Sequence, residues 1–303
     1  MKNRPSLKKL HYLVALEQEQ HFHRAAKSCF VSQSTLSAGI QSLEEELNCQ
    51  LIERDHKTFN FTPLGHEIVT KAKRLLSEVD DLISLAENQG RPEAGTVRVG
   101  CIPTIAPFLL NHLMREVRDA YPELTLLLKE DTTSNLLDAL DSGTLDLLIL
   151  ALPVDLRGFR SRVLGADPFH LVMHRDMQEQ FTPDQEQESL PDESIFLLEK
   201  EHCLSTHAVS ACQLQNRRKI NPFAATSLHT LVQMVDAKLG ATYLPKMAID
   251  NGILQNTQLL AKPLNQEAYR EVGIAWRQTS SRLATYGLLG EVIAKLLPLP
   301  NSD

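Results

Sequence analysis

The feature that most constrains this chain is a regular apolar stripe within residues 63–88. Its apolar residues recur at spacings of 4, 3, 4, 3 and 4, which is a coiled-coil seam sustained over nearly three heptads. Thr62-Pro63 is a cap-plus-first-turn signal before it, and Gly90 and Pro92 end it. At ~1.5 Å per residue this helix would be roughly 40 Å long. A helix of that length with one apolar stripe needs a partner, most simply a second copy of itself. The stripe consists of Ile68, Ala72, Leu75, Val79, Leu82 and Ala86.

The residues before the stripe predict short helices joined by tight turns. Residues 7–19 carry apolar side chains at a helical period, and Ala25-Ala26 within residues 22–29 lets a second helix pack closely. Phe30-Val31-Ser32 is a turn signal, in which Ser32 can cap a helix over residues 33–47. Two helices joined by a short turn form the helix-turn-helix pattern.

The first turn of that last helix carries short polar side chains, which can approach base edges and phosphates. Residues 51–61 then alternate imperfectly and include Arg54, which predicts a small β-wing with a basic side chain for phosphates. A solvated helix face is the alternative interpretation of the polar group. The wing and the seam beside it favour DNA binding. The polar residues of this helix start are Gln33, Ser34, Thr35 and Ser37.

From Thr96 onward the pattern changes to alternating strands and helices, which predicts an α/β region with mostly parallel sheets. About 200 residues of this kind suit two subdomains with a cleft between them. Residues 178–192 are acidic and rich in Gln and Pro, and we expect a surface loop there. The expected strands are 96–101, 124–129, 145–150, 169–173, 195–198, 241–244 and 272–276, and the expected helices include 106–120, 134–142, 227–237 and 282–296.

The net charge of −7 is unusual for a protein that binds nucleic acid, but its distribution matters more than its sum. Residues 1–60 hold 8 Lys/Arg and 7 Asp/Glu, a net of +1, whereas residues 91–303 hold 20 and 26, a net of −6. The acidity therefore lies outside the predicted DNA-binding region and does not exclude a DNA partner.

The sequence also indicates in which cellular compartment the protein is expected. It has no run of 18 apolar residues, and its basic first ten residues are not followed by an apolar segment, so we expect neither a membrane span nor a leader. A cytoplasmic location follows as an expectation, and thiols there stay reduced. Five cysteines, an odd number, argue against a structural disulfide framework. Any disulfide would be transient.

Two of the cysteines, Cys203 and Cys212, lie nine residues apart, and His202 directly precedes the first. Such a pair can be a redox switch, half of a metal site or two buried thiols. Together with His207 the segment holds suitable ligand atoms, but their spacing matches no common zinc pattern. No metal is expected.

The chain as a whole resembles the LysR-type transcriptional regulators, and within them the peroxide-sensing OxyR group. The resemblance covers nearly the whole chain. The first likeness is carried by residues 22–26, 31–37, 40–44 and 62–65, which read FHRAA, VSQSTLS, IQSLE and TPLG. The second is carried by Ile102-Pro103-Thr104, Leu140-Asp141-Ser142-Gly143, His202-Cys203-Leu204 with Cys212, and Ala225-Thr226-Ser227-Leu228.

The resemblance implies roles for the matching residues. Cys203 would be the peroxide-reactive thiol, and Cys212 the resolving thiol that joins it in a reversible disulfide. A polar pocket that orients peroxide would be formed by Thr104, Thr133, His202 and Arg277. The DNA-facing residues would be Ser32, Gln33, Ser34, Thr35 and Ser37, with Arg54 near phosphates.

The resemblance also implies an architecture. A winged helix-turn-helix domain would span residues 1–62, a dimerisation helix 63–90 and a regulatory domain 91–303. The regulatory domain would resemble periplasmic binding proteins, with subdomain I at about 91–163 and 269–303 and subdomain II at about 164–268. The protein would regulate oxidative-stress genes without a cofactor and would not be an enzyme. Its expected partners are pseudo-palindromic double-stranded DNA, further copies of itself up to a homotetramer, RNA polymerase during activation, and hydrogen peroxide as signal.

The sequence departs from the family pattern beside the thiol, with Glu201 in place of Gly and Ser205 in place of Arg. An added negative charge and a missing cation should both disfavour the thiolate, so we expect a less sensitive sensor. Two other functions stay open. The cleft could bind a small-molecule effector instead of peroxide, or the thiols could belong to a thiol peroxidase.

Overall fold

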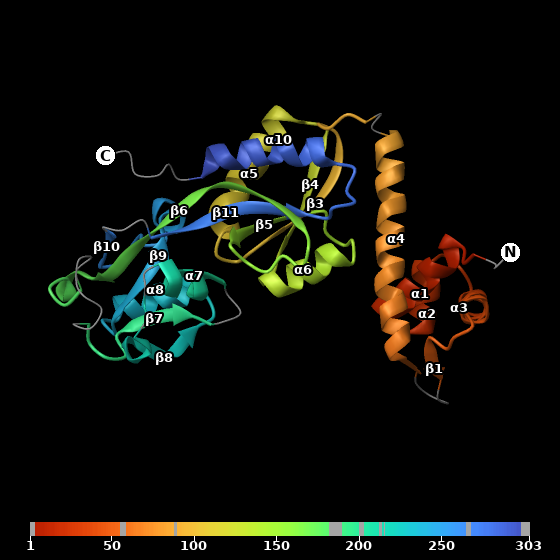
Figure 1. The fold of residues 1–303 in the computed structure, drawn as a ribbon, viewed down its shortest axis with the longest axis horizontal. Coiled ribbons are helices and arrows are strands. Elements are labelled where there is room, and N and C mark those ends of the chain that lie inside the picture. The colour runs from red at the N-terminus through yellow and green to blue at the C-terminus, as the bar shows by residue number, and fades with distance from the viewer. Residues whose placement is uncertain are drawn as a thin grey trace. The chain divides into compact units, whose positions relative to one another are not determined.

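The computed structural model describes residues 4–54, 59–87, 90–181, 190–199, 203–211, 214, 216–264 and 268–297. Contacts divide the chain into two units: Met1–Gly90 with Ala139–Leu145, and Arg91–Asp138 with Asp146–Asp303 (Figure 1). No helix in the described part of the chain combines the length and the apolarity that a membrane span requires.

The first unit is built on α1 (Leu7–Glu19), α2 (Phe22–Ser28) and α3 (Gln33–Leu47), which confirms the three predicted helices. Their apolar faces meet in one core. Burial of each large aliphatic side chain there contributes about 1.5–3 kcal/mol relative to exposure, so the core holds the helix-turn-helix angle without a disulfide. The large aliphatic side chains without exposed surface in this core are Leu13, Leu16, Leu36, Ile40, Leu43 and Leu51.

The predicted wing is present as the antiparallel pair β1 (Ile52–Arg54) and β2 (Phe59–Phe61). Behind it, the Thr62 hydroxyl accepts a hydrogen bond from the Gly65 amide at 2.9 Å, which caps the next helix. A Cβ at Gly65 would lie 2.2 Å from the Leu51 carbonyl oxygen. Only glycine therefore allows the wing to pass so close to the helix start.

The predicted seam forms the long helix α4 (Pro63–Glu87). Its stripe divides into two parts. Ala72 is buried in the core of the first unit and Ile68 packs against that core. Leu75 and Leu82, further along, are 49% and 67% exposed. The first half of the seam therefore holds the helix to its own domain, and the second half stays open for another chain.

The second unit contains a nine-stranded mixed sheet with the order β4-β3-β5-β11-β6-β9-β7-β8, and β10 pairs with β6. The pairs among β3, β4 and β5 and among β7, β8 and β9 are parallel, but β11 and β6 pair antiparallel to their neighbours. The expectation of mostly parallel sheets is therefore correct only for the two ends. The strands are β3 (Gly95–Cys101), β4 (Leu124–Glu130), β5 (Leu147–Leu152), β6 (Arg160–His174), β7 (Ile195–Leu198), β8 (Ile220–Ala225), β9 (Ala241–Pro245), β10 (Leu259–Pro263) and β11 (Tyr269–Trp276).

Strand β6 is much longer than the predicted 169–173. Its first half pairs with β11 and its second half with β9 and β10. The residues from Arg160 to Val163 are exposed, so no apolar run marks them as a strand in the sequence. Long β6 and β11 run between the two groups of parallel strands (Figure 1).

Most of the remaining helices contact this sheet, and α5 also packs on α10. They are α5 (Ala106–Ala120), α6 (Thr133–Asp141), α7 (Cys203–Ala211), α8 (Leu228–Asp236), α9 (Lys246–Asp250) and α10 (Leu283–Leu296), with 3-10 turns η1 (Arg175–Met177) and η3 (Arg217–Lys219). Most of the predicted surface loop at 178–192 lies outside the described residues. The predicted subdomain boundaries stay a prediction.

Candidate functional site

Cys203 is the first residue of α7, directly at the helix N-terminus. The helix packs on β7 and β11 through its apolar face, where Leu204 and Ala208 are almost fully buried. Cys203 itself is partly exposed. A thiol at a helix start faces unpaired backbone N–H groups and the positive end of the helix dipole, both of which favour a thiolate.

Thr133 contacts the thiol from another segment of the chain. Its hydroxyl lies 3.6 Å from the Cys203 Sγ and donates to it. Thr133 begins helix α6, far from Cys203 in sequence but in the same unit. The structure therefore brings together two of the residues that were predicted as one site.

Thr104, the other predicted threonine, is 2% exposed and is held by Arg270. The Arg270 guanidinium donates to the Thr104 hydroxyl at 2.8 Å and to the Thr104 carbonyl oxygen at 3.0 Å. It also forms an ion pair with Asp167 at 2.9 Å, in which both side chains are 0% exposed. Arg270 was not among the predicted residues, and its strand position is not marked by any motif.

The electrostatics of Cys203 favour the charged form. Burial opposes ionisation, but the interaction with His207, the hydrogen bond from Thr133 and the positive charge of Arg270 outweigh it and lower the pKa of the Cys203 thiol. The pKa of His207 moves the other way. Burial lowers it, but the interactions with Cys203 and the Pro153 carbonyl raise it above its usual value.

The other described cysteines behave differently. Burial raises the pKa of Cys101, which is fully enclosed, and it also raises the pKa of Cys29. Of Cys29, Cys101 and Cys203, Cys203 alone has a pKa shifted toward the thiolate.

The lowered pKa of Cys203 does not compare this chain with its family, so the expectation that the departures at 201 and 205 disfavour the thiolate stays a prediction. Ser205 is buried, and its hydroxyl donates to the Leu198 carbonyl oxygen, so it joins the start of α7 to the end of β7. His207, one turn after Cys203 on the same helix, is among the groups that lower the pKa of the thiol. Glu201, like the predicted His202 and Cys212, lies outside the described residues.

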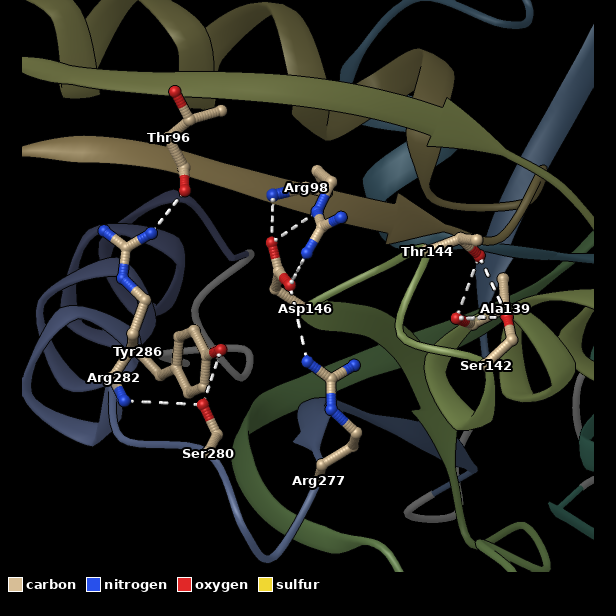
Figure 2. Close-up of polar contacts among 10 residues, drawn as sticks. All are labelled: Thr96, Arg98, Ala139, Ser142, Thr144, Asp146, Arg277, Ser280, Arg282 and Tyr286. Carbon is tan, nitrogen blue, oxygen red and sulfur yellow. Dashed lines mark hydrogen bonds and ion pairs between the residues drawn. The ribbon is translucent and has the colours of Figure 1, made fainter. Parts of the chain in front are cut away.

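Arg277 is not placed beside Thr104. Figure 2 shows its guanidinium directed at Asp146, with a separation of 3.5 Å. Arg98 binds the same carboxylate through its backbone N–H at 2.8 Å and through its guanidinium at 3.0 and 2.7 Å. Asp146 therefore joins β3, β5 and the end of β11 within the second unit. The cationic side chain that contacts Thr104 is Arg270.

In the first unit, the side chains at the start of α3 are exposed as predicted for a DNA-facing helix. Ser32 caps the helix by accepting from the Thr35 backbone N–H at 3.1 Å, so its hydroxyl also has a structural role. Arg54 reaches from the wing to Ser37 at 3.2 Å and lies over the Phe22 ring. The wing and α3 therefore present one continuous surface. Ser32, Gln33, Ser34 and Thr35 are exposed and Ser37 is half-buried.

No group of three or more potential metal ligands occurs among the residues that the structure describes. The alternative metal site at Cys203 would need His202 and Cys212, which lie outside them.

Known proteins show the same two-part organisation. The model "LysR substrate binding domain" matches residues 90–297, and "Bacterial regulatory helix-turn-helix protein, lysR family" matches residues 7–66. The chain is 36% identical over 296 residues to the HTH-type transcriptional regulator EstR of Acinetobacter baylyi, covering 96% of this chain and 97% of EstR. It is 36% identical over 288 residues to the hydrogen peroxide-inducible genes activator of Escherichia coli, covering 95% and 94%.

Solved structures agree with this likeness. The reduced regulatory domain of OxyR2 from Vibrio vulnificus is 55% identical, with a TM-score of 0.66, and covers 68% of this chain and 97% of that one. A full-length OxyR variant from Pseudomonas aeruginosa is 32% identical, with a TM-score of 0.78, and covers 96% and 98%. The chain therefore belongs to the LysR family of DNA-binding transcriptional regulators, which are not enzymes, and within it is a regulator of the OxyR kind.

Proposed function

We propose that this regulator senses hydrogen peroxide through oxidation of Cys203. One observation carries the proposal: Cys203 is partly exposed, lies at the start of α7 and has a lowered pKa. A thiolate is the form that attacks peroxide, and a partly exposed thiolate is the form that peroxide can reach. The peroxide-inducible relative supports the same signal.

The first step joins sulfur to one peroxide oxygen. The Cys203 thiolate attacks that oxygen, the O–O bond breaks, and the other oxygen leaves as hydroxide and takes up a proton to become water. Sulfur is oxidised by two electrons to a sulfenic acid, and peroxide is reduced. Thr133, which donates to Sγ, is positioned to orient peroxide there. We assign Thr104, with Arg270 in place of Arg277, to the same polar surroundings, and His202 keeps its predicted role.

In the second step the sulfenic acid condenses with the Cys212 thiol, giving a disulfide and water. Helix α7 runs from Cys203 to Ala211. At ~1.5 Å per residue its ends are about 12 Å apart, whereas a disulfide needs Cα atoms within roughly 7 Å. Bond formation must therefore unwind or bend α7, which supplies the two-state element that a switch requires.

The change in α7 would alter DNA binding through the contacts between protomers. Leu75 and Leu82 on α4 are exposed, and we assign them to a homodimer seam within a homotetramer that binds a pseudo-palindromic site. Oxidation would alter the spacing of the paired recognition helices and so the contact with RNA polymerase and the expression of oxidative-stress genes. DNA binding places the protein with the chromosome, in the cytoplasm of a bacterial cell.

The deciding experiment compares operator footprints of the full-length protein before and after peroxide. The wild-type footprint should change, and the Cys203→Ser footprint should not. Cys29→Ser, which removes a thiol with a raised pKa, should respond like wild type. Identical wild-type footprints and proteolysis patterns in both redox states would contradict the proposal.

A small-molecule effector stays the second candidate, because the family model that matches residues 90–297 is described as a substrate binding domain. Under that alternative, Cys203→Ser would lose any peroxide response and still change its footprint when the effector is added.

A further inference from the structure

We propose that His207 is the proton acceptor for the Cys203 thiol, so that the sensor rests as a thiolate–imidazolium pair on one face of α7. The proposal deepens the peroxide-sensing function proposed above and rests on it. His207 is a positioning and activating residue in this scheme, because peroxide reacts at sulfur and the imidazole acts through the sulfur.

The first argument is the placement of the ring. His207 lies four residues after Cys203 on α7, and side chains four apart on a helix are neighbours on the same face. A helical side chain also points back toward the N-terminus, which here is the thiol end. His207 is 8% exposed, so bulk water does not separate the two groups.

The second argument is the tautomer. His207 Nε2 lies 2.9 Å from the Pro153 carbonyl oxygen. A carbonyl oxygen can only accept, so Nε2 must carry the hydrogen. In the neutral ring Nδ1 is then the basic nitrogen. The Pro153 carbonyl lies next to the end of β5, so the body of the sheet fixes which nitrogen can take a proton, in the manner of a base oriented by a third group.

The third argument is the state of Nδ1. It is buried and has no hydrogen-bond partner of ordinary geometry among the described residues. An unpaired polar atom in such a place costs about 1–3 kcal/mol. Protonation of Nδ1 next to a thiolate converts that atom into a donor facing an anion, and the pair is neutral overall. The reciprocal shifts of the two groups, a lowered pKa for Cys203 and a raised pKa for His207, agree with this exchange.

The charges around the pair are consistent with it. Arg270 lowers the pKa of both groups through its positive charge, so it favours the thiolate and opposes the imidazolium. Its charge is largely matched by Asp167. Thr133 donates to sulfur and contributes no charge. His207 is thus the described basic group that can accept the proton of the thiol.

The proton balance closes over one oxidation. The thiol proton moves to Nδ1, the thiolate attacks peroxide, and the leaving hydroxide takes one proton to become water. His207 ends neutral, and thiol plus peroxide has become sulfenic acid plus water. No further oxidant or reductant is required.

The test uses His207→Gln in the full-length protein. Glutamine can still donate an amide hydrogen toward the Pro153 carbonyl, but it has no basic nitrogen. The readout is the pH profile of Cys203 alkylation by iodoacetamide, read by peptide mass spectrometry so that the other cysteines do not contribute. His229→Gln, an exposed histidine on α8, is the matched control.

We expect His207→Gln to move the alkylation midpoint up by about one pH unit or more. At a pH below both midpoints, each pH unit by which the midpoint rises should slow alkylation about three- to fourfold, because the thiolate population drops tenfold while its intrinsic nucleophilicity increases. At high pH, where both thiols are fully ionised, His207→Gln should react about threefold faster for each pH unit by which its midpoint has risen, because its thiolate is the stronger nucleophile. An unchanged midpoint in a folded His207→Gln protein would overturn the proposal, as would an equal rise in His229→Gln.

A second measurement does not depend on that variant's folding. The pKa of His207 is followed by NMR in wild type and in Cys203→Ser. If the two groups share a proton, removal of the thiol must lower the pKa of His207, since coupling between two sites is reciprocal. An unchanged pKa would contradict the pair. Neither measurement uses peroxide, so the two proposals can fail separately. If Cys203 and His207 are coupled but the DNA footprint does not change with peroxide, the inference about His207 holds and the proposed function is wrong.

Discussion

At the scale of single residues, the surroundings of a thiol decide its chemistry. Cys203 and Cys101 carry the same group, yet their pKa values shift in opposite directions. Cys101 ends a buried strand with no exposed surface, and desolvation dominates there. Cys203 is also largely enclosed, but the hydrogen bond from Thr133 and the interaction with His207 reverse the effect of burial on its pKa.

The Cys101 environment predicts a pH dependence of stability. The pKa of Cys101 is raised in the folded protein. Its contribution to the free energy of unfolding is therefore fully present below the pKa of the unfolded thiol. The contribution is lost as the pH rises above that pKa, because the unfolded thiol can ionise and the folded one cannot. The free energy of unfolding should fall by up to about 1.4 kcal/mol per pH unit above about pH 8.5 from this group. In Cys101→Val, the part of the fall in the free energy of unfolding that comes from this thiol should be absent. Urea unfolding of both proteins between pH 7 and 10 measures it, and equal slopes would contradict the prediction.

The buried pair of Asp167 and Arg270 predicts a large stability loss. Removal of one partner leaves an uncompensated charge in a site with 0% exposure, so Asp167→Ala should cost about 3–5 kcal/mol. The matched control is Asp250→Ala, whose carboxylate pairs with Lys246 one turn away on a partly exposed helix face and should lose only about 0.3–0.5 kcal/mol. Denaturant unfolding checks both, and similar losses in the two variants would show that the buried pair carries no special cost.

At the scale of elements, α7 holds the reactive thiol at its start and must give way for a disulfide to form. Its stability therefore opposes oxidation. Thr206 is an exposed position within it, where a substitution changes helix propensity with little effect on packing.

The helix is expected to tune the redox potential. Glycine costs a helix about 1 kcal/mol relative to alanine, and about 1.4 kcal/mol corresponds to 30 mV for a two-electron couple. The Cys203–Cys212 potential of Thr206→Gly should therefore be about 20 mV more negative than that of Thr206→Ala, because the disulfide form gains when the reduced helix is weakened. Equilibration with glutathione buffers measures it. Equal potentials would mean that α7 keeps its helix in the oxidised protein.

At the scale of the whole molecule, charge is divided by function. The first 60 residues carry +1 and residues 91–303 carry −6, so the acidity lies outside the helix-turn-helix region, where we propose that α3 and the wing face DNA. Binding to that face depends on phosphate contacts and weakens as salt rises.

Arg54 is expected to supply one of those contacts. Arg54→Ala should weaken binding to operator and unrelated DNA alike and reduce the slope of log affinity against log salt by about one. Arg118→Ala, at an exposed cation on α5 in the other unit, should leave the slope unchanged. Fluorescence anisotropy at several salt concentrations distinguishes them. If Arg54→Ala also leaves the slope unchanged, Arg54 does not contact phosphate.

Local signals predicted much of this molecule. The helix-turn-helix, the wing and α4 follow from helical periodicity, caps and turns, which depend on residues close in sequence. The antiparallel course of β6 and β11 was missed, since exposed Arg160–Val163 lack a strand pattern and strand direction depends on distant pairing. Arg270 was missed for Arg277 because both are single arginines on or next to one strand, and only the fold shows which one meets Thr104.

The sequence by itself determined the family, the helices of the helix-turn-helix and the candidate thiol, because these depend on motifs and periodicities that short segments carry. Only the tertiary structure decided what surrounds that thiol. Thr133 arrives from α6, Arg270 from β11 and the Pro153 carbonyl from the end of β5. Long-range packing brings these groups to α7, where Thr133 and Arg270, together with His207, lower the pKa of Cys203 against the effect of burial.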